Sequence, residues 1–267
     1  MRYVALLRGA FALAWREGTA YRFSFAMSFL VIALPFTLQV FLWRAVFSGR
    51  ASLAGYSFSR MVAYYVLALL LFDFVQPTLL YDVADDIKSG NLAAHLLRPV
   101  PYPLWSAGVR FGSQAVYLVV VALTVGLISW LLVVLGYLNP GEWSLERAAA
   151  FLLVFALAWL VGLLLSLAVS FAVFFTEDAS GLSKVVGFVF PLFSGALIPL
   201  DLLPRWLQII GKYLPFRWLV YEPIRVFSGR AALLDVLPAL LAWALLAALL
   251  AWLLWRAGEA RFTAVGG

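Results

Sequence analysis

Long hydrophobic runs alternate with short polar segments along the chain. Five runs are long enough for helices that cross a membrane: residues 23–43, 61–81, 111–141, 148–176 and 236–255, with Asp73 as the one charged residue within them. About 20 apolar residues cross the hydrocarbon core of a bilayer, and a helix satisfies every backbone hydrogen bond internally. The pattern therefore predicts a spanning helix at each of these five places.

A sixth span is predicted over residues 185–200, where the charge-free run is shorter. The segment that follows, 201–230, stays rich in tryptophan, tyrosine and leucine but contains Pro204, Pro215 and Pro223. Proline interrupts helices, and aromatic residues favour the membrane–water interface. A short spanning helix followed by re-entrant or interfacial helices fits this pattern better than one straight span.

The first twenty residues lack the long apolar core and the cleavage site of a secretory signal. On a helical projection Val4 and Phe11 fall on one side, and Arg2, Arg8 and Arg16 fall on another. This arrangement predicts an interfacial helix over residues 1–20. The alternative is an extension of the first span.

Composition agrees with a polytopic membrane protein. The chain of 267 residues is 65% hydrophobic and 12% charged, with a mean hydropathy of +1.00. We therefore predict an all-α fold with six transmembrane helices in a single domain, residues 1–267, and no room for a large water-soluble catalytic domain. The net charge of +6 is interpreted as arginines that flank apolar spans, so no nucleic-acid partner is predicted.

Several kinds of chemistry are excluded or disfavoured. The chain has no cysteine and one histidine, which excludes thiolate catalysis, cysteine metal sites and histidine clusters. Asp82, Asp85 and Asp86 stand together, but at the exit of a helix, and we interpret them as part of an aqueous loop and not as a metal or acid–base site. No catalytic residue, metal or cofactor is predicted.

Six spans put both termini on one side of the membrane. Lysine and arginine are divided almost equally between the two sides, although the arginine-rich N-terminus favours the cytoplasm. Charge alone therefore leaves the orientation nearly open.

The longest polar interruption in the first half is the loop of residues 82–108. Gly90 can end a helix, and Pro99 disfavours helix at Arg98, so a short helix is predicted over residues 91–97. Its residues Leu92, Ala93, Leu96 and Leu97 share one face. Such a helix docks onto another protein or onto lipid, and the alternative is a solvated linker.

Asp73 is the one ionisable residue in the middle of a predicted span. A charge there costs about 2.5 kcal/mol or more unless it faces protein or water. It could line a transport path or bond to a neighbouring helix, and the nearby Gln76 and Thr78 could serve either role.

Two stretches resemble the type 2 ATP-binding-cassette (ABC) export permeases. The segment DDIKSGNLAAHLLRPVPYPLW is similar to the cytoplasmic loop of that family, whose I-x-x-G-x-L…L-L-x-P pattern falls on Ile87, Gly90, Leu92, Leu96, Leu97 and Pro99. The segment PLFSGALIPLDLLPRWLQIIGKYLPF is similar to the end of that family's fifth span and the start of its extracellular re-entrant segment. The re-entrant segment corresponds to residues 201–230 of this chain. The resemblance covers nearly the whole chain.

The resemblance implies a permease subunit that works with a second six-span permease, identical or related, and with two cytoplasmic ABC ATPase subunits. It implies that loop 82–108 is the cytoplasmic coupling loop, and that the export path runs beside the first, second and fifth spans. The expected contacts with the ATPase are Ile87, Gly90, Asn91, Leu92, His95, Leu96, Leu97 and Arg98. The candidate residues for the path are Asp73, Gln76 and Ser194.

The chain carries no phosphate-binding loop of the form G-x-x-x-x-G-K-[ST], so ATP hydrolysis is expected from another chain. The expected location is the plasma or inner membrane of a prokaryote, with both termini in the cytoplasm and membrane lipid around the spans. Two alternatives stay open: a proton-coupled secondary transporter that uses Asp73, and a membrane-embedded enzyme.

Overall fold

The computed structural model describes residues 22–78, 81–138, 144–176 and 179–262, and in these ranges the fold is all-α, as predicted. The interfacial helix predicted for residues 1–20 lies outside the described residues. The helices are α2 (Arg22–Val46), α3 (Phe58–Val75), α4 (Tyr81–Ser89), α5 (Leu92–Leu96), α6 (Tyr102–Val134), α7 (Leu145–Phe171), η1 (Ala172–Phe175), α8 (Ala179–Ser194), η2 (Leu200–Leu202), α9 (Arg205–Lys212), η3 (Pro215–Trp218), α10 (Tyr221–Phe227) and α11 (Leu233–Glu259).

Four helical stretches in the described ranges are long and apolar enough to cross a membrane: Phe58–Val75, Tyr102–Val134, Leu145–Phe174 and Leu233–Glu259. Two shorter apolar stretches, Ala33–Val46 in α2 and Ser180–Ser194 in α8, complete the bundle. These six segments overlap, in order, the six runs predicted from the sequence as spans, and four of them have the length and composition to cross a membrane.

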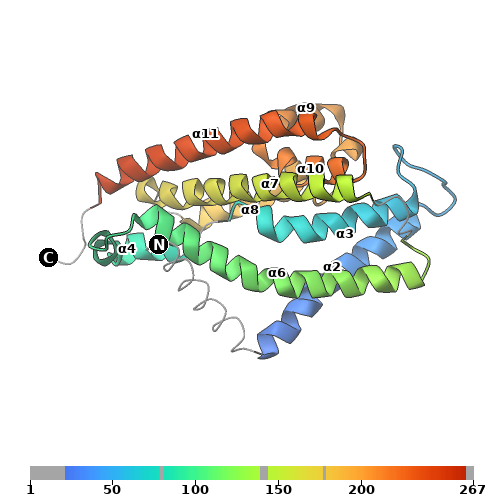
Figure 1. Cartoon of the computed structure of the whole chain (residues 1–267), viewed down its shortest axis with the longest axis horizontal. Helices are drawn as coiled ribbons and strands as arrows, with labels where there is room; N and C mark the ends of the chain where they lie inside the picture. The colour runs from blue at the N-terminus through green and yellow to red at the C-terminus, as the bar shows by residue number, and fades with distance from the viewer. Residues whose placement is uncertain (1–21, 79–80, 139–143, 177–178, 263–267) are drawn as a thin grey trace.

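Helix α7 lies at the centre of the bundle, packed along α11 and against α3 and α10 (Figure 1). Small buried residues make this close packing possible: Ala158 and Gly162 on α7, and Ala247 and Ala251 on α11. Small side chains let helix backbones approach closely in membrane proteins, where van der Waals contact replaces the hydrophobic effect between helices.

The outer faces of the bundle are apolar. On α6, Leu123 is 64% exposed and Trp130 is 63% exposed, and on α11 Leu245 is 73% exposed. Exposed leucines and tryptophans at this density are typical of a lipid-facing surface.

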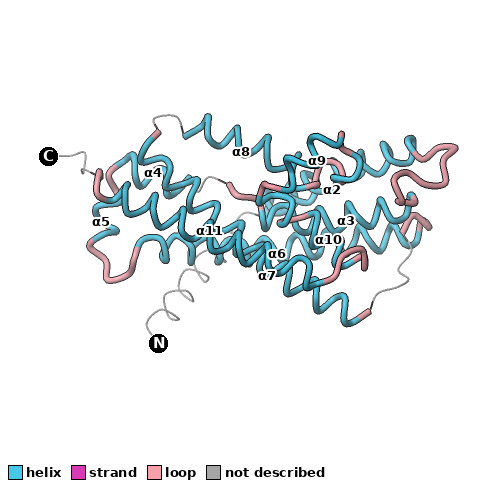
Figure 2. The backbone as a smooth tube through the Cα atoms, turned by 90° about the horizontal axis from the view of Figure 1, so that it is seen from above, coloured by secondary structure: helices cyan, strands magenta, loops and turns pink. Residues whose placement is uncertain are grey.

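The two ends of the bundle differ. Helices α4 and α5 lie at one end, close to the C-terminal end of α11, and the loop of residues 47–57 lies at the other end (Figures 1 and 2). Helix α9 and helix α10 are toward the end that holds this loop. The most polar short helix, α4, and the segment between α8 and α11 therefore lie toward opposite ends of the bundle.

The second predicted span is divided in the structure. Residues 61–81 were expected to form one helix, but α3 ends at Val75 and α4 begins at Tyr81. Pro77 explains the break, because proline lacks an N–H and disfavours helical conformation in the residue before it, and Gln76 adopts φ −61° and ψ 121°.

Prolines also shape the segment after α8. Pro204 precedes the first residue of α9, Pro215 begins η3, and Pro223 lies in the first turn of α10. The start of a helix tolerates proline because the first N–H groups have no partner within the helix. The prolines thus divide this segment into short helices, as the sequence pattern indicated.

Candidate functional site

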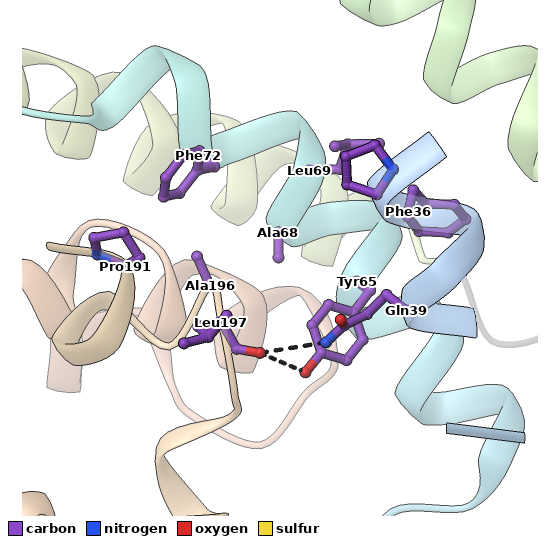
Figure 3. A pocket seen from close by; sticks show the side chains of 10 residues that line it. Phe36, Gln39, Tyr65, Ala68, Leu69, Phe72, Pro191, Ala196 and Leu197 are labelled. Carbon is purple, nitrogen blue, oxygen red and sulfur yellow. Dashed lines mark hydrogen bonds between the residues drawn. The ribbon is translucent and has the colours of Figure 1, made fainter. Parts of the chain in front are cut away.

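A pocket of about 210 Å³ lies between α2, α3 and α8 (Figure 3). Helix α3 contributes Tyr65, Ala68, Leu69 and Phe72, which are spaced three and four residues apart and therefore share one face of the helix. The other lining residues are Pro35, Phe36 and Gln39 on α2, and Pro191, Ala196 and Leu197 in and after α8.

The polar groups of the pocket gather at one edge. The backbone carbonyl of Leu197 accepts a hydrogen bond from the Tyr65 hydroxyl at 3.0 Å and from Gln39 Nε2 at 3.3 Å (Figure 3). All other lining side chains are apolar, and none carries a formal charge. Such a pocket suits an apolar or amphipathic group with an uncharged polar end.

Ser194, a candidate for the path, does not line this pocket. Its side chain is fully buried, and its hydroxyl donates to the carbonyl of Pro191 at 3.4 Å and accepts from the N–H of Ala196 at 3.3 Å. Ser194 therefore stabilises the turn that ends α8. The pocket residues Gln39 and Tyr65 were missed from the sequence, because isolated polar residues in separate apolar spans give no indication of a shared site.

Gly195 continues this turn with φ +82°, a left-handed conformation that glycine adopts without steric cost. The Tyr64 hydroxyl donates to its carbonyl at 2.6 Å, and a Cβ atom at Gly195 would lie 2.7 Å from that hydroxyl oxygen. The end of α8 is thus held tightly against α3 just beside the pocket.

Asp73 faces α6 and not the pocket. Its Oδ2 atom accepts a hydrogen bond from the Tyr117 hydroxyl at 2.9 Å. One turn away on α6, Gln114 Nε2 donates to the carbonyl of Phe74 at 3.0 Å, and Gln114 Oε1 accepts from Trp159 Nε1 of α7 at 2.6 Å. Of the two roles considered for Asp73, this geometry favours the bond to a neighbouring helix.

The polar residues of α6 that bond to the end of α3 were not recognised from the sequence. Gln114 and Tyr117 are three residues apart, so they share the face of α6 that lies against the last turn of α3. Gln76, the other candidate of this region, caps α3 with its backbone N–H, which donates to the carbonyl of Phe72 at 3.0 Å. Gln76 is also absent from the pocket lining.

The short helix predicted at residues 91–97 is present as α5, which follows Gly90 with φ +80°. Its apolar residues differ in burial. Leu92 is fully buried within the chain, whereas Leu97 is 89% exposed and Leu96 is 39% exposed. The expectation that Leu92 lies on the exposed docking face was therefore wrong.

Leu92 is buried because α5 folds back onto the bundle. It belongs to an apolar cluster with Val83 of α4, Tyr102 of α6, Phe171 of α7 and Trp255 of α11. Ile87, another predicted contact residue, packs partly buried against the same cluster. We call α4, α5 and this cluster the α4–α5 corner.

His95 contacts the acidic side chain of Asp86 within the α4–α5 corner. Its Nε2 atom lies 3.6 Å from Asp86 Oδ2, which also accepts a hydrogen bond from the Tyr102 hydroxyl at 2.7 Å. The guanidinium of Arg98 lies 5.5 Å from the ring centroid of Trp105. Asn91 is exposed and makes no side-chain capping bond. Arg98, Asn91, Leu96 and Leu97 thus form the exposed part of the predicted contact set.

A second polar cluster, which the sequence did not indicate, lies at the opposite end. The Tyr56 hydroxyl donates to Asp201 Oδ2 at 3.1 Å, and the Tyr221 hydroxyl donates to Asp201 Oδ1. Burial, and then the neighbouring Asp201 carboxylate, raise the pKa of Tyr56 well above its usual value, so it remains a neutral donor. Nearby, Glu222 is buried between Arg217 at 2.6 Å and Arg225 at 2.9 Å.

Comparison with known protein families agrees with this architecture. A family model described as "ABC-2 family transporter protein" matches residues 33–266. The matched region begins within α2 and extends past α11, so it includes the pocket, the α4–α5 corner and the cluster around Asp201. A search of curated proteins found no match.

Proposed function

The chain belongs to the ABC-2 transporter family, and we propose that it is the permease subunit of an ATP-driven export system in the prokaryotic plasma or inner membrane. The observation that carries the proposal is the pocket between α2, α3 and α8. These helices are the first, second and fifth apolar segments, beside which the export path of such permeases is expected.

In the proposed topology α2, α3, α6, α7, α8 and α11 cross the membrane. Both termini and the α4–α5 corner are then cytoplasmic, and the segment 201–230 is extracellular. Two features support this arrangement: the six apolar segments in order, and the separation of α4–α5 from the loop of residues 47–57 at opposite ends of the bundle.

On the export path we place Tyr65 and Gln39, which supply the polar edge of the pocket. Asp73 and Ser194 were expected on the path from the sequence, but we assign them structural roles. The hydrogen bond of Asp73 connects α3 to α6, and that of Ser194 stabilises the turn at the end of α8. The cargo group that enters the pocket is apolar, or amphipathic with an uncharged polar end, since the walls carry no formal charge.

The α4–α5 corner is the proposed contact with a cytoplasmic ABC ATPase. Leu97 and Leu96 present apolar side chains to the partner, and Arg98 and Asn91 flank them. Leu92 fixes this surface to the bundle by its burial under α6, α7 and α11. A second permease, identical or related, completes the path, as the resemblance to the family implies.

The proposal is tested by purifying the tagged chain from its native membrane and identifying the proteins that remain bound to it. We expect an ABC ATPase to co-purify, and the complex to hydrolyse ATP in a vanadate-sensitive reaction. The chain expressed and purified alone should neither bind nor hydrolyse ATP, since it lacks the phosphate-binding loop. Hydrolysis by the isolated chain, or a native complex without an ATPase, would refute the proposal.

A further inference from the structure

Trp43, in the last turns of α2, has a buried hydrogen-bond donor without an acceptor. The residue is only 6% exposed, and no atom of the described residues accepts a hydrogen bond from its buried Nε1 atom. A tryptophan near the end of a span commonly directs its N–H to water or to lipid headgroups, but burial prevents this here. An unpaired buried donor is costly, because it loses its bond to water and gains none in return.

The unpaired N–H lies beside the polar edge of the pocket. Trp43 follows Gln39 by four residues, so the two side chains share one face of α2. The Trp43 ring centroid lies 6.0 Å from that of Tyr65, and the side chains of Gln39 and Trp43 both lie close to the Tyr65 hydroxyl. Trp43 does not line the pocket itself, so a ligand can use its N–H only through Tyr65.

The Leu197 carbonyl at this edge is fully used. It accepts from the Tyr65 hydroxyl at 3.0 Å and from Gln39 Nε2 at 3.3 Å, and a carbonyl oxygen has two lone pairs (Figure 3). A ligand that offers only donors, such as an ammonium group, must therefore displace one of these bonds, and no lining residue carries a negative charge to attract it.

A hydrocarbon ligand would leave the Trp43 N–H unpaired, whereas an acceptor atom would allow every donor to be used. If the Tyr65 O–H turns from the Leu197 carbonyl to a ligand oxygen, the phenol oxygen becomes available to the Trp43 N–H. Gln39 keeps the Leu197 carbonyl. One bond is then lost and two are gained, so the acceptor ligand adds one hydrogen bond to this edge.

We propose that the pocket selects an uncharged cargo that carries a hydrogen-bond acceptor, such as a carbonyl or ether oxygen, at one end of an apolar body. Tyr65 donates to this acceptor, and Trp43 is a positioning residue that holds the Tyr65 hydroxyl in the bound arrangement. The proposal rests on the function proposed above, since it names the class of cargo for the same pocket.

Photo-crosslinking with three matched probes tests this selectivity. Each probe has the same alkyl chain with a diazirine, and the probes differ only at one end: a methyl ketone, the hydrocarbon of the same shape, or a primary ammonium. The full chain in lipid nanodiscs is irradiated with each probe, and the labelled residues are identified by mass spectrometry. Labelling of the pocket lining is divided by labelling at Leu245, an exposed residue of α11, which corrects for partition of each probe into lipid.

We expect the ketone to label the pocket about fivefold more than the hydrocarbon does, which is the effect of one additional neutral hydrogen bond. The ammonium probe should label it no more than the hydrocarbon does. Equal labelling by the ketone and the hydrocarbon, as in a pocket where trapped water alone satisfies the Trp43 N–H, would overturn the proposal.

Trp43→Phe separates positioning from packing, because it keeps an aromatic ring and removes only the donor. The ketone should then lose its advantage, since its exchange at Tyr65 adds no further bond, while labelling by the hydrocarbon stays the same. A packing defect would change both probes alike. Trp130→Phe, the same substitution on the exposed face of α6, is the control and should leave the ratio unchanged. An undiminished ketone preference in Trp43→Phe would exclude the role of Trp43.

The measurement needs neither ATP nor an ATPase, so its failure differs from a failure of the proposed function. A native complex without an ATPase would refute export and leave the ketone preference of the pocket as measured. An ATPase-containing complex whose pocket shows no ketone preference would refute the cargo class alone.

Discussion

Truncation to alanine should affect ATPase binding at Leu97 and the stability of the fold at Leu92. They are the same residue type, five positions apart, but Leu92 is fully buried within the chain and Leu97 is 89% exposed. If the exposed face of the α4–α5 corner binds an ATPase, Leu97→Ala should weaken that binding without loss of fold. Leu92→Ala should weaken the fold of the corner.

The expected magnitudes follow from the buried carbon atoms. Truncation of leucine to alanine removes three carbons, and burial contributes about 0.8 kcal/mol for each, which gives roughly 2.4 kcal/mol if Leu97 is fully buried by the partner. At about 1.4 kcal/mol per tenfold, the ATPase should bind roughly fiftyfold more weakly. For Leu92→Ala the cavity in a packed cluster predicts a loss of about 2–5 kcal/mol in the free energy of unfolding.

Both quantities can be measured on the purified chain in lipid nanodiscs. Binding of the purified ATPase is titrated for the parent chain, Leu97→Ala and Leu92→Ala, and thermal unfolding is followed for the same three samples. Leu234→Ala, the same truncation at an exposed leucine in the first turn of α11, is the control and should leave both quantities nearly unchanged. Parent-like ATPase binding by Leu97→Ala would refute the assigned contact, and parent-like unfolding of Leu92→Ala would refute its role as an anchor.

Three further predictions concern topology, the end of α8 and the pocket. Single cysteines at Asn91 and Ser144, probed in intact cells with a membrane-impermeant thiol reagent, should label only at position 144, and labelling at 91 would overturn the proposed orientation. Gly195→Ala should destabilise the fold by about 1–2 kcal/mol from its positive φ alone, and more from contact with the Tyr64 hydroxyl, so an unchanged melting temperature would contradict the described turn. Ala196→Phe should fill the pocket and abolish transport while the ATPase remains bound, and normal transport would exclude the pocket from the path.

Most of the fold could be predicted because the membrane imposes a simple rule on sequence. Each spanning helix must be apolar over its length, so the runs at 111–141, 148–176 and 236–255 indicated α6, α7 and α11 with errors at the ends only. The short helix after Gly90 was also predictable, since glycine and proline bound it on either side. These signals are local, and they need no knowledge of neighbouring helices.

The candidate site was harder to predict because its residues are brought together by tertiary packing. Tyr65 and Gln39 meet at the carbonyl of Leu197, which lies 132 positions from Tyr65 in the chain. The burial of Leu92 was hard to predict for the same reason. The apolar face of α5 could bind a partner protein or the bundle of its own chain, and only the packing of Leu92 in the cluster with Trp255 and Phe171 decides between the two. In an amphipathic helix of five residues, the sequence pattern identifies the faces but not what covers each.

The break between α3 and α4 has a consequence for how movement could pass through the permease. The pocket face of α3 ends at Phe72, just before the break at Gln76, whereas the α4–α5 corner packs on α6, α7 and α11. If Leu97 binds an ATPase as proposed, force applied there enters those three helices first. Helix α3 packs against both α6 and α7, and its last turn is also joined to α6 by the hydrogen bonds of Tyr117 and Gln114, so movement of α6 and α7 reaches α3 directly. An ionisable residue inside a span is costly, and in this permease its position at that junction gives Asp73 a structural reason to be there.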